Sequence, residues 1–172
     1  VSVKLPAGDG KYLEYVYTLK GDDYRVGLTM NMINLNNVIA ANAGYLELDW
    51  QQKLLKQEKD HKNENSATAA YYRYTDEEVD NLSMTDDESE ELKTKVNWLG
   101  FKQHYFSQVI IADKGFESPS KISSTMLTDD VDLKLMKANI TIPYSHQNAE
   151  TVGMSFYFGP NHYQTLKKYN IG

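Results

Sequence analysis

The 172-residue sequence contains no cysteine, only 4 prolines and no long hydrophobic run. The absence of cysteine excludes disulfides, thiolate metal sites and cysteine nucleophiles. No stretch approaches the roughly 20 apolar residues of a membrane-spanning helix. The sequence begins at Val1 with neither an initiator methionine nor a signal-peptide pattern, so we expect an excised, water-soluble piece of a longer protein.

The sequence has fewer basic residues than acidic ones. Lysine and arginine total 18 residues against 24 aspartates and glutamates, which gives a formal net charge of −6 and a sequence pI of about 5.2. This balance disfavours electrostatic binding to nucleic acid or to anionic lipid. We therefore expect no nucleic-acid partner.

The residue types that carry enzyme chemistry form no recognisable motif. The histidines are dispersed, without the spacing that places two of them on one face for zinc, and His104 is interpreted as a hydrogen-bonded residue of a sheet. The acidic stretch at 74–92 lacks the ligand spacing of a calcium loop, and there is no G-x-S-x-G elbow. We predict no enzyme: no catalytic residue, no metal site and no cofactor. The histidines are His61, His104, His146 and His162.

Tyrosine dominates the aromatic residues, with 13 tyrosines against 5 phenylalanines and 2 tryptophans. The tyrosines stand beside valine, isoleucine and threonine in short alternating runs, which is typical of antiparallel sheets with one solvated face. At roughly 150 residues per domain, the length predicts one domain. The expected fold is therefore a single all-β domain over residues 1–172, mainly antiparallel.

Alternation and turn residues divide the chain into about seven strands. The clearest pair is a hairpin, in which residues 11–19 and 24–33 flank the turn Gly21-Asp22-Asp23. Residues 34–44 and 115–120 are predicted loops, and 51–65 is predicted to be a strand end followed by a solvated loop. The remaining predicted strands are residues 45–55, 67–74, 97–113, 122–127, 133–143 and 151–158.

Helices are predicted at three places. The runs that begin at Thr75 and Thr85 each match a capping box, in which a threonine is followed three residues later by a glutamate, so two short helical segments are expected there. Near the end of the chain, Gly159-Pro160 should stop the last strand, and Asn161 should cap a helix over residues 162–169.

Three segments of the sequence, residues 17–37, 95–113 and 154–169, together resemble the periplasmic domain of bacterial YidC-type membrane protein insertases. YTLKGDDYRVGLTMNMINLNN (17–37) is similar to a hairpin of that family, and MSFYFGPNHYQTLKKY (154–169) is similar to its closing strand and helix. KVNWLGFKQHYFSQVIIAD (95–113) resembles the family's most recognisable core motif. The residues of that family core motif are Trp98, Gly100, Gln103, Tyr105 and Phe106.

The resemblance implies a twisted β-sandwich of the galactose-mutarotase-like supersandwich type at the periplasmic face of the bacterial inner membrane. It implies a non-catalytic interaction domain that assists membrane protein insertion and folding. The implied partners are the transmembrane insertase core of the same polypeptide, the Sec translocon with its accessory subunits, and nascent membrane proteins. The family domain is longer, so the N-terminal part of its sandwich is expected to be missing here. Unpaired sheet edges should then favour a homodimer.

The segment expected to matter most for interaction is the last strand with the helix that follows it. In this helix, Tyr163, Leu166 and Tyr169 recur at every third position, so they are expected to share one helix face. An alternative function is a carbohydrate-binding or carbohydrate-processing module, in which tyrosines and Trp50 would stack on a sugar ring. The candidate interaction residues are Phe156, Tyr157, Phe158, Gly159, Pro160, Asn161, Tyr163, Leu166 and Tyr169.

Overall fold

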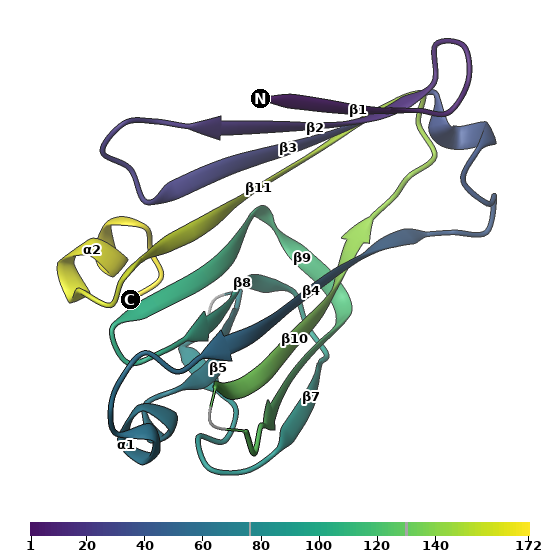
Figure 1. Ribbon diagram of the computed structural model, residues 1–172. Helices are drawn as coiled ribbons and strands as arrows, with labels where there is room; N and C mark the ends of the chain where they lie inside the picture. The colour runs from purple at the N-terminus through teal and green to yellow at the C-terminus, as the bar shows by residue number, and fades with distance from the viewer. Residues whose placement is uncertain (76, 130) are drawn as a thin grey trace.

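The computed structural model describes residues 1–75, 77–129 and 131–172 as two twisted, mainly antiparallel β-sheets that share one long strand (Figure 1). The expected sandwich-like all-β fold is confirmed. Across these described residues, no helix has the length and apolar character needed to cross a membrane.

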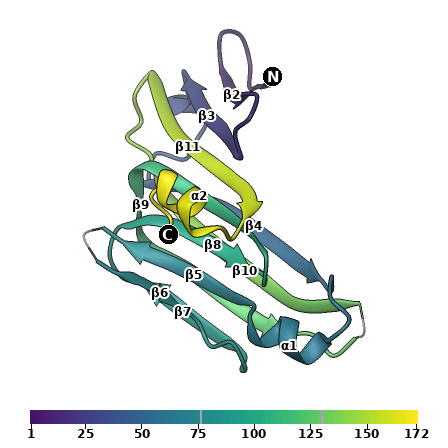
Figure 2. The same ribbon diagram turned by 90° about the vertical axis from the view of Figure 1, so that its left-hand side faces the viewer.

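Sheet A is the larger of the two, and sheet B covers part of one of its faces (Figure 2). In spatial order, sheet A consists of β1 (Ser2–Pro6), β2 (Tyr12–Leu19), β3 (Arg25–Ile33), β11 (Ala149–Pro160), the first half of β9 (Phe106–Met126), β8 (Val96–Lys102), β5 (Ala69–Tyr74) and β6 (Val79–Asn81). Sheet B consists of β4 (Tyr45–Leu55), β10 (Asp132–Pro143), the second half of β9 and β7 (Glu88–Leu92).

Strand β9 passes from one sheet into the other. Its first half pairs with β8 and β11, and from Glu117 onward it pairs with β10. The prediction of a loop at 115–120 is wrong, because the strand is continuous there. Gly115 has a φ of 80° beside a register irregularity between β8 and β9, so this glycine permits a bend that sequence inspection mistakes for a loop.

Alternation identified most of the other strands. The β2–β3 hairpin is confirmed, with Leu13 opposite Met32 and Tyr17 opposite Leu28. Strand β4 has the predicted bounds, and β5, β10 and β11 lie where strands were expected. The predicted single strand at 97–113 is instead two strands, β8 and β9. A tight turn joins them, in which the Gln103 backbone N–H donates to the Phe106 carbonyl at 2.9 Å.

Both predicted capping-box helices are wrong for the described residues, although Asp76 of the first box lies outside them. Strands β6 and β7 occupy these positions, and the turn between them uses the expected capping groups differently. The Glu88 carboxylate accepts from the Ser83 backbone N–H, and the Thr85 hydroxyl donates to Asp86 at 2.8 Å. These polar groups therefore stabilise a turn and not a helix end. The pairing of β7 with β9 in sheet B stabilises the extended conformation more than the capping-box pattern stabilises a helix.

The predicted loop over 51–65 contains a short helix, α1 (His61–Ser66). The Asp60 carboxylate caps it by accepting from the Asn63 N–H at 3.1 Å. A single turn of polar residues shows no apolar periodicity, so the pattern gave no sign of it. A 3₁₀ turn, η1 (Leu35–Asn37), follows β3, and α2 (Tyr163–Lys168) follows β11.

The main core lies between the two sheets, and an aromatic row crosses it. The Trp50 ring stacks on Phe101 with centroids 4.0 Å apart and meets the edge of Phe156 at 6.0 Å. A second, smaller cluster lies on the opposite face of sheet A, beneath α2. Its buried members are Trp98, Val109, Tyr157, Tyr169 and Ile171.

Candidate interaction site at the C-terminal helix

Asn161 fixes the point at which the chain leaves strand β11. Its side-chain oxygen accepts from the Ser107 hydroxyl at 2.6 Å, and its amide donates to the carbonyls of Gln103 at 2.7 Å and His104 at 3.1 Å. Its backbone N–H donates to the Tyr105 carbonyl at 2.7 Å. The prediction that Asn161 caps the helix is wrong, because this side chain instead ties the chain to the β8–β9 turn.

His162 takes the N-cap position of α2, without a side-chain bond to the helix backbone. Its ring nitrogen Nδ1 instead lies 3.1 Å from the Thr165 hydroxyl. Lys167 and Lys168 occupy the last turn, where the negative end of the helix dipole favours positive charge.

Tyr157 and Gly159 form the floor on which α2 rests. Tyr157 is fully buried, and its hydroxyl donates to the Pro160 carbonyl at 2.7 Å. Burial raises the pKa of this phenol to about 12. A Cβ at position 159 would lie 2.6 Å from the Tyr157 ring, so glycine is required for the ring to fold back over the strand.

Tyr169 links the end of α2 to the turn between β2 and β3. Its hydroxyl donates to Asp23 Oδ1 at 2.7 Å and accepts from the Tyr24 backbone N–H at 3.3 Å. Its ring lies 5.1 Å from that of Tyr157. The bond from Tyr169 is the main reason that the pKa of Asp23 lies below its usual value.

The three residues predicted to share one helix face have different environments. Tyr169 is buried and Leu166 packs against the cluster beneath the helix, but Tyr163 is 62% exposed. The aromatic residues of strand β11 also differ in their exposure to solvent. Phe156 packs against the main core, whereas Phe158, on the same face but nearer the end of the strand, is 47% exposed.

The family core motif supplies both buried and exposed residues to this region. Trp98 is buried beneath α2, and its Nε1 has no hydrogen-bond partner among the described residues. At Gly100 a Cβ would lie 3.1 Å from Val109, so glycine allows β8 and β9 to pack closely. Gln103 donates to the Leu55 carbonyl at 2.8 Å, which ties the turn to sheet B.

The remaining motif residues, Tyr105 and Phe106, are 60% and 62% exposed. Tyr105 stacks on His104 with centroids 4.2 Å apart, and His104 Nδ1 lies 2.7 Å from a Glu58 carboxylate oxygen. The interpretation of His104 as a hydrogen-bonded residue is confirmed, although it lies in the turn and not in a strand.

A small apolar cavity of about 210 Å³ opens beside α2, lined in part by Tyr71, Trp98, Leu166 and Ile171. Lys102 also lines it, and burial lowers the pKa of this ammonium. Sequence reasoning missed Tyr71 and Lys102 as site residues. Their positions in β5 and β8 were predictable from alternation, but the packing of α2 over them was not.

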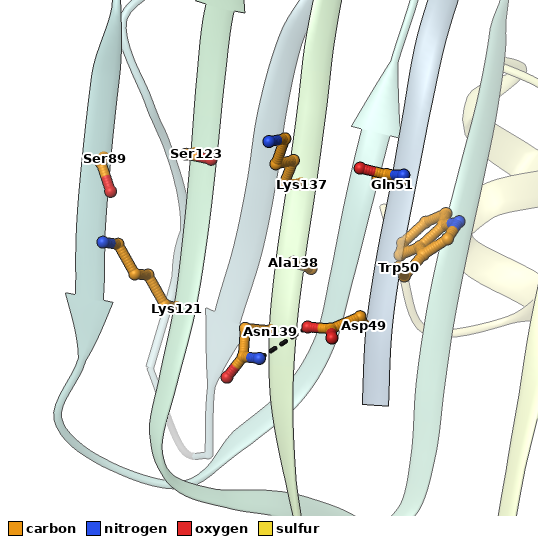
Figure 3. A pocket seen from close by; sticks show the side chains of 9 residues that line it. All are labelled: Asp49, Trp50, Gln51, Ser89, Lys121, Ser123, Lys137, Ala138 and Asn139. Atoms are coloured by element: carbon orange, nitrogen blue, oxygen red, sulfur yellow. Dashed lines mark hydrogen bonds between the residues drawn. The ribbon is translucent and has the colours of Figure 1, made fainter. Parts of the chain in front are cut away.

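A cavity of about 660 Å³ lies on the outer face of sheet B and is lined mainly by polar side chains (Figure 3). Lys121 and Lys137 project over it, and the Asn139 amide donates to Asp49 at 2.6 Å. Trp50 lies at its border, but its ring stacks on Phe101 in the core. One face of the Trp50 ring is therefore occupied by Phe101, and a role for Trp50 in sugar binding stays a prediction.

In the part of the chain that the structure describes, no group of three or more histidine, aspartate or glutamate side chains is arranged to hold a metal ion. The arrangement around α2 consists of packed aromatic rings, tethering hydrogen bonds and exposed aromatic side chains. Such a surface is suited to binding.

Sequence comparison relates the whole chain to known proteins. The profile of the YidC periplasmic domain matches residues 1–171. A membrane protein insertase YidC from Parabacteroides distasonis is 35% identical over 172 residues, and one from Porphyromonas gingivalis strain ATCC 33277 is 34% identical over 173 residues. Both alignments cover 100% of this chain, which spans only 27% and 28% of the two relatives.

The YidC of Bacteroides fragilis strain ATCC 25285 is 31% identical over 172 residues, again with full coverage of this chain and 28% of the relative. The profile match and the relatives agree along the entire length. This chain belongs to the YidC periplasmic domain family, whose members are periplasmic parts of an inner-membrane insertase.

Proposed function

We propose that this chain is a non-catalytic interaction domain that assists membrane protein insertion and folding, and that α2 couples its sandwich to the transmembrane core of the same polypeptide. The Sec translocon with its accessory subunits and nascent membrane proteins are further proposed partners. In this proposal the domain acts by binding alone and uses no cofactor.

The attachment of α2 is the observation that supports this proposal. A helix of six residues is not stable in water on its own, so its position depends on tertiary contacts. Asn161 fixes its start to the β8–β9 turn, and Tyr169 fixes its end to the β2–β3 turn. The helix therefore has a defined orientation relative to sheet A, as a coupling element requires.

We also propose that residues 1–172 fold as one domain. Strand β9 belongs to both sheets, and the main core draws residues from β3, β8, β10 and β11. Neither sheet could bury its apolar face without the other.

Complementation of an insertase-depleted strain tests the coupling role. A full-length insertase that contains this domain would carry Leu166→Ala with Tyr169→Ala, which removes the side chains that seat α2. The matched control is Met30→Ala, which removes a buried side chain from the main core, far from the helix. Expression levels would be compared by immunoblotting.

We expect the α2 variant to slow growth and to lower insertion of reporter membrane proteins at wild-type expression levels, while the Met30 variant supports both. Equal insertion by the two variants and the wild type would contradict the proposed coupling. So would an equal loss in both variants, because that result would reduce α2 to a contributor to domain stability.

A further inference from the structure

Exposed aromatic side chains gather at the end of the sandwich that carries α2. We define the aromatic rim as Tyr105 and Phe106 of the β8–β9 turn and the start of β9, Phe158 near the end of β11, and Tyr163 of α2. Their exposed fractions are 60%, 62%, 47% and 62%. This end lies on the left in Figure 1 and faces the viewer in Figure 2.

Rim residues are neighbours in the fold although they are far apart in the sequence. Phe106 lies opposite Pro160 and Gln108 lies opposite Phe158, so both phenylalanines project from the same face as diagonal neighbours. The bond from the Asn161 backbone to the Tyr105 carbonyl brings the turn beside the start of α2. The rim thus gathers residues of the β8–β9 turn, β11 and α2 at one end of sheet A.

Two rim side chains, Phe158 and Tyr105, stack on neighbouring rings in the absence of a partner. The Phe158 ring stacks on Phe156 with centroids 5.8 Å apart, and Phe156 packs against Trp50. Side chains that are ordered in advance lose little conformational entropy on binding. Adjacent exposed aromatic residues on a folded surface usually mark a place of interaction.

The charges at this end differ from those of the chain as a whole. Lys167 and Lys168 are exposed on α2, and Arg25 lies in the adjoining β3. The nearby carboxylates are Asp22 and Asp23 of the β2–β3 turn and Glu58, of which Asp23 accepts from Tyr169 and Glu58 lies 2.7 Å from His104. The lysines of α2 therefore place positive charge beside the rim, although the chain has a net charge of −6.

We propose that the aromatic rim docks into the headgroup layer of a lipid bilayer. Tyrosine and phenylalanine beside lysine form the combination that suits a membrane–water interface, where rings enter the acyl boundary and ammonium groups stay among phosphates. The bordering lysines offset the repulsion that an anionic surface exerts on an acidic chain. The family's place at the inner membrane brings such a surface within reach. This inference goes beyond coupling to a protein core, because its partner is lipid.

A tryptophan placed in the rim can report this contact. The complete 172-residue chain would carry Phe106→Trp and a hexahistidine tag after Gly172, and would be held on vesicles of phosphatidylethanolamine and phosphatidylglycerol doped with a nickel-chelating lipid. The matched control is Tyr45→Trp, because Tyr45 is 49% exposed at the start of β4, at the opposite end of the molecule (Figure 1). Trp50 and Trp98 give the same background in both proteins, and thermal unfolding would confirm that each variant is folded.

On vesicles with brominated acyl chains, we expect Phe106→Trp to lose emission relative to unbrominated vesicles, and Tyr45→Trp to keep its emission. Adding Phe158→Ser to the Phe106→Trp protein should reduce that loss, because it removes the aromatic neighbour of position 106 from the rim. Equal quenching of the rim and control tryptophans would overturn the proposal. Quenching at position 106 that Phe158→Ser leaves unchanged would also overturn it, because the tether at the C-terminus would then explain the proximity. Absence of quenching at the rim would also overturn it. None of these results depends on the complementation outcome for α2.

Discussion

The hydroxyl of Tyr169 donates a hydrogen bond of 2.7 Å to Asp23, a residue 146 positions earlier in the sequence. This bond joins the end of α2 to the β2–β3 turn, on the opposite side of the helix from the Asn161 contacts. The short helix is thereby held at both ends, and several properties of the domain should depend on it.

Tyr169→Phe should lower the free energy of unfolding by about 1 kcal/mol, the usual net value of a hydrogen bond. The bond to Asp23 at 2.7 Å accounts for most of this loss, because the bond from the Tyr24 N–H is long at 3.3 Å. The ring remains in place, so the loss isolates the hydroxyl. Chemical denaturation at pH 7 measures it. Tyr163→Phe is the control, because that ring is exposed, and it should leave the stability unchanged.

The hydrogen bond between Tyr169 and Asp23 also predicts that the stability of the domain depends on pH. The pKa of Asp23 is held below its usual 3.8 mainly by the Tyr169 bond, so its contribution to stability is complete above that value and is lost as the pH falls through the lowered pKa. As the pH falls below about 4, the stability of the wild type should therefore approach that of Tyr169→Phe. Denaturation curves for both proteins across this range would show converging stabilities. A difference that stays constant would contradict the assignment.

Gly159→Ala should destabilise the domain by about 1–3 kcal/mol, in the range of overpacked cores, because the new Cβ would press on the buried Tyr157 ring. Gly153→Ala is the comparison. Its Cβ would meet the exposed Asp113 carboxylate, which can swing away, so the cost should be smaller. Thermal unfolding would rank the two variants, and a greater loss in Gly153→Ala would contradict this account.

Lys134 is a fully buried lysine whose ammonium donates to the carbonyls of Thr68 at 2.5 Å and Met84 at 2.7 Å. Desolvation lowers its pKa from 10.5 to about 8. At a pH between these two pKa values, the unfolded chain binds more protons at Lys134 than the folded chain does. The contribution of Lys134 to the free energy of unfolding therefore rises with pH.

We therefore expect the free energy of unfolding of the wild type to rise relative to that of Lys134→Met between about pH 8 and 10. The exposed Lys137 on the same strand provides the control, Lys137→Met, which should track the wild type throughout. Urea denaturation at several pH values makes the comparison. A constant difference between wild type and Lys134→Met would show that Lys134 is not the titrating group.

The large cavity on sheet B should bind no free sugar more tightly than millimolar, and the protein should show no aldose epimerase or glycoside hydrolase activity. The aromatic ring expected to stack on a sugar, Trp50, is engaged in the core. Isothermal titration with aldoses and short oligosaccharides tests this, and saturable binding in the micromolar range would revive the carbohydrate alternative.

The purified chain should form a homodimer through strand edges. In the described part of the chain, β4 pairs only with β10 over its 11 residues, and β1 pairs only with β2. Such edges offer unpaired backbone groups to a second copy. Light scattering at increasing concentration should approach twice 19.7 kDa. A constant mass of 19.7 kDa would contradict the prediction.

Period-two alternation located most of the strands that have one buried face. It located the β2–β3 hairpin and gave β4 its bounds. It failed at β7, because a capping-box pattern is a local preference and strand pairing is a long-range gain. Glu90 of β7, for example, accepts a hydrogen bond of 2.6 Å from Tyr72 of β5, a partner that no local pattern reveals.

The candidate site was only partly predictable for the same reason. Its segment was located by resemblance, and Gly159-Pro160 correctly marked the end of the last strand. The roles of Asn161 and Tyr169 depend on partners in the turns at 103–105 and 20–24, which come near only when sheet A has formed. The exposure of Phe106 and Phe158 depends on where sheet B stops, which sequence periodicity does not encode.

Strand β11 lies between β3 and β9 and leads directly into α2. Its backbone hydrogen bonds run across the strand on both sides. Tension applied at α2 along β11 would load these two ladders in shear, so many bonds would have to fail together. A pull across the sheet would instead unzip them one after another. The domain should therefore resist force along one axis and yield more readily along the other.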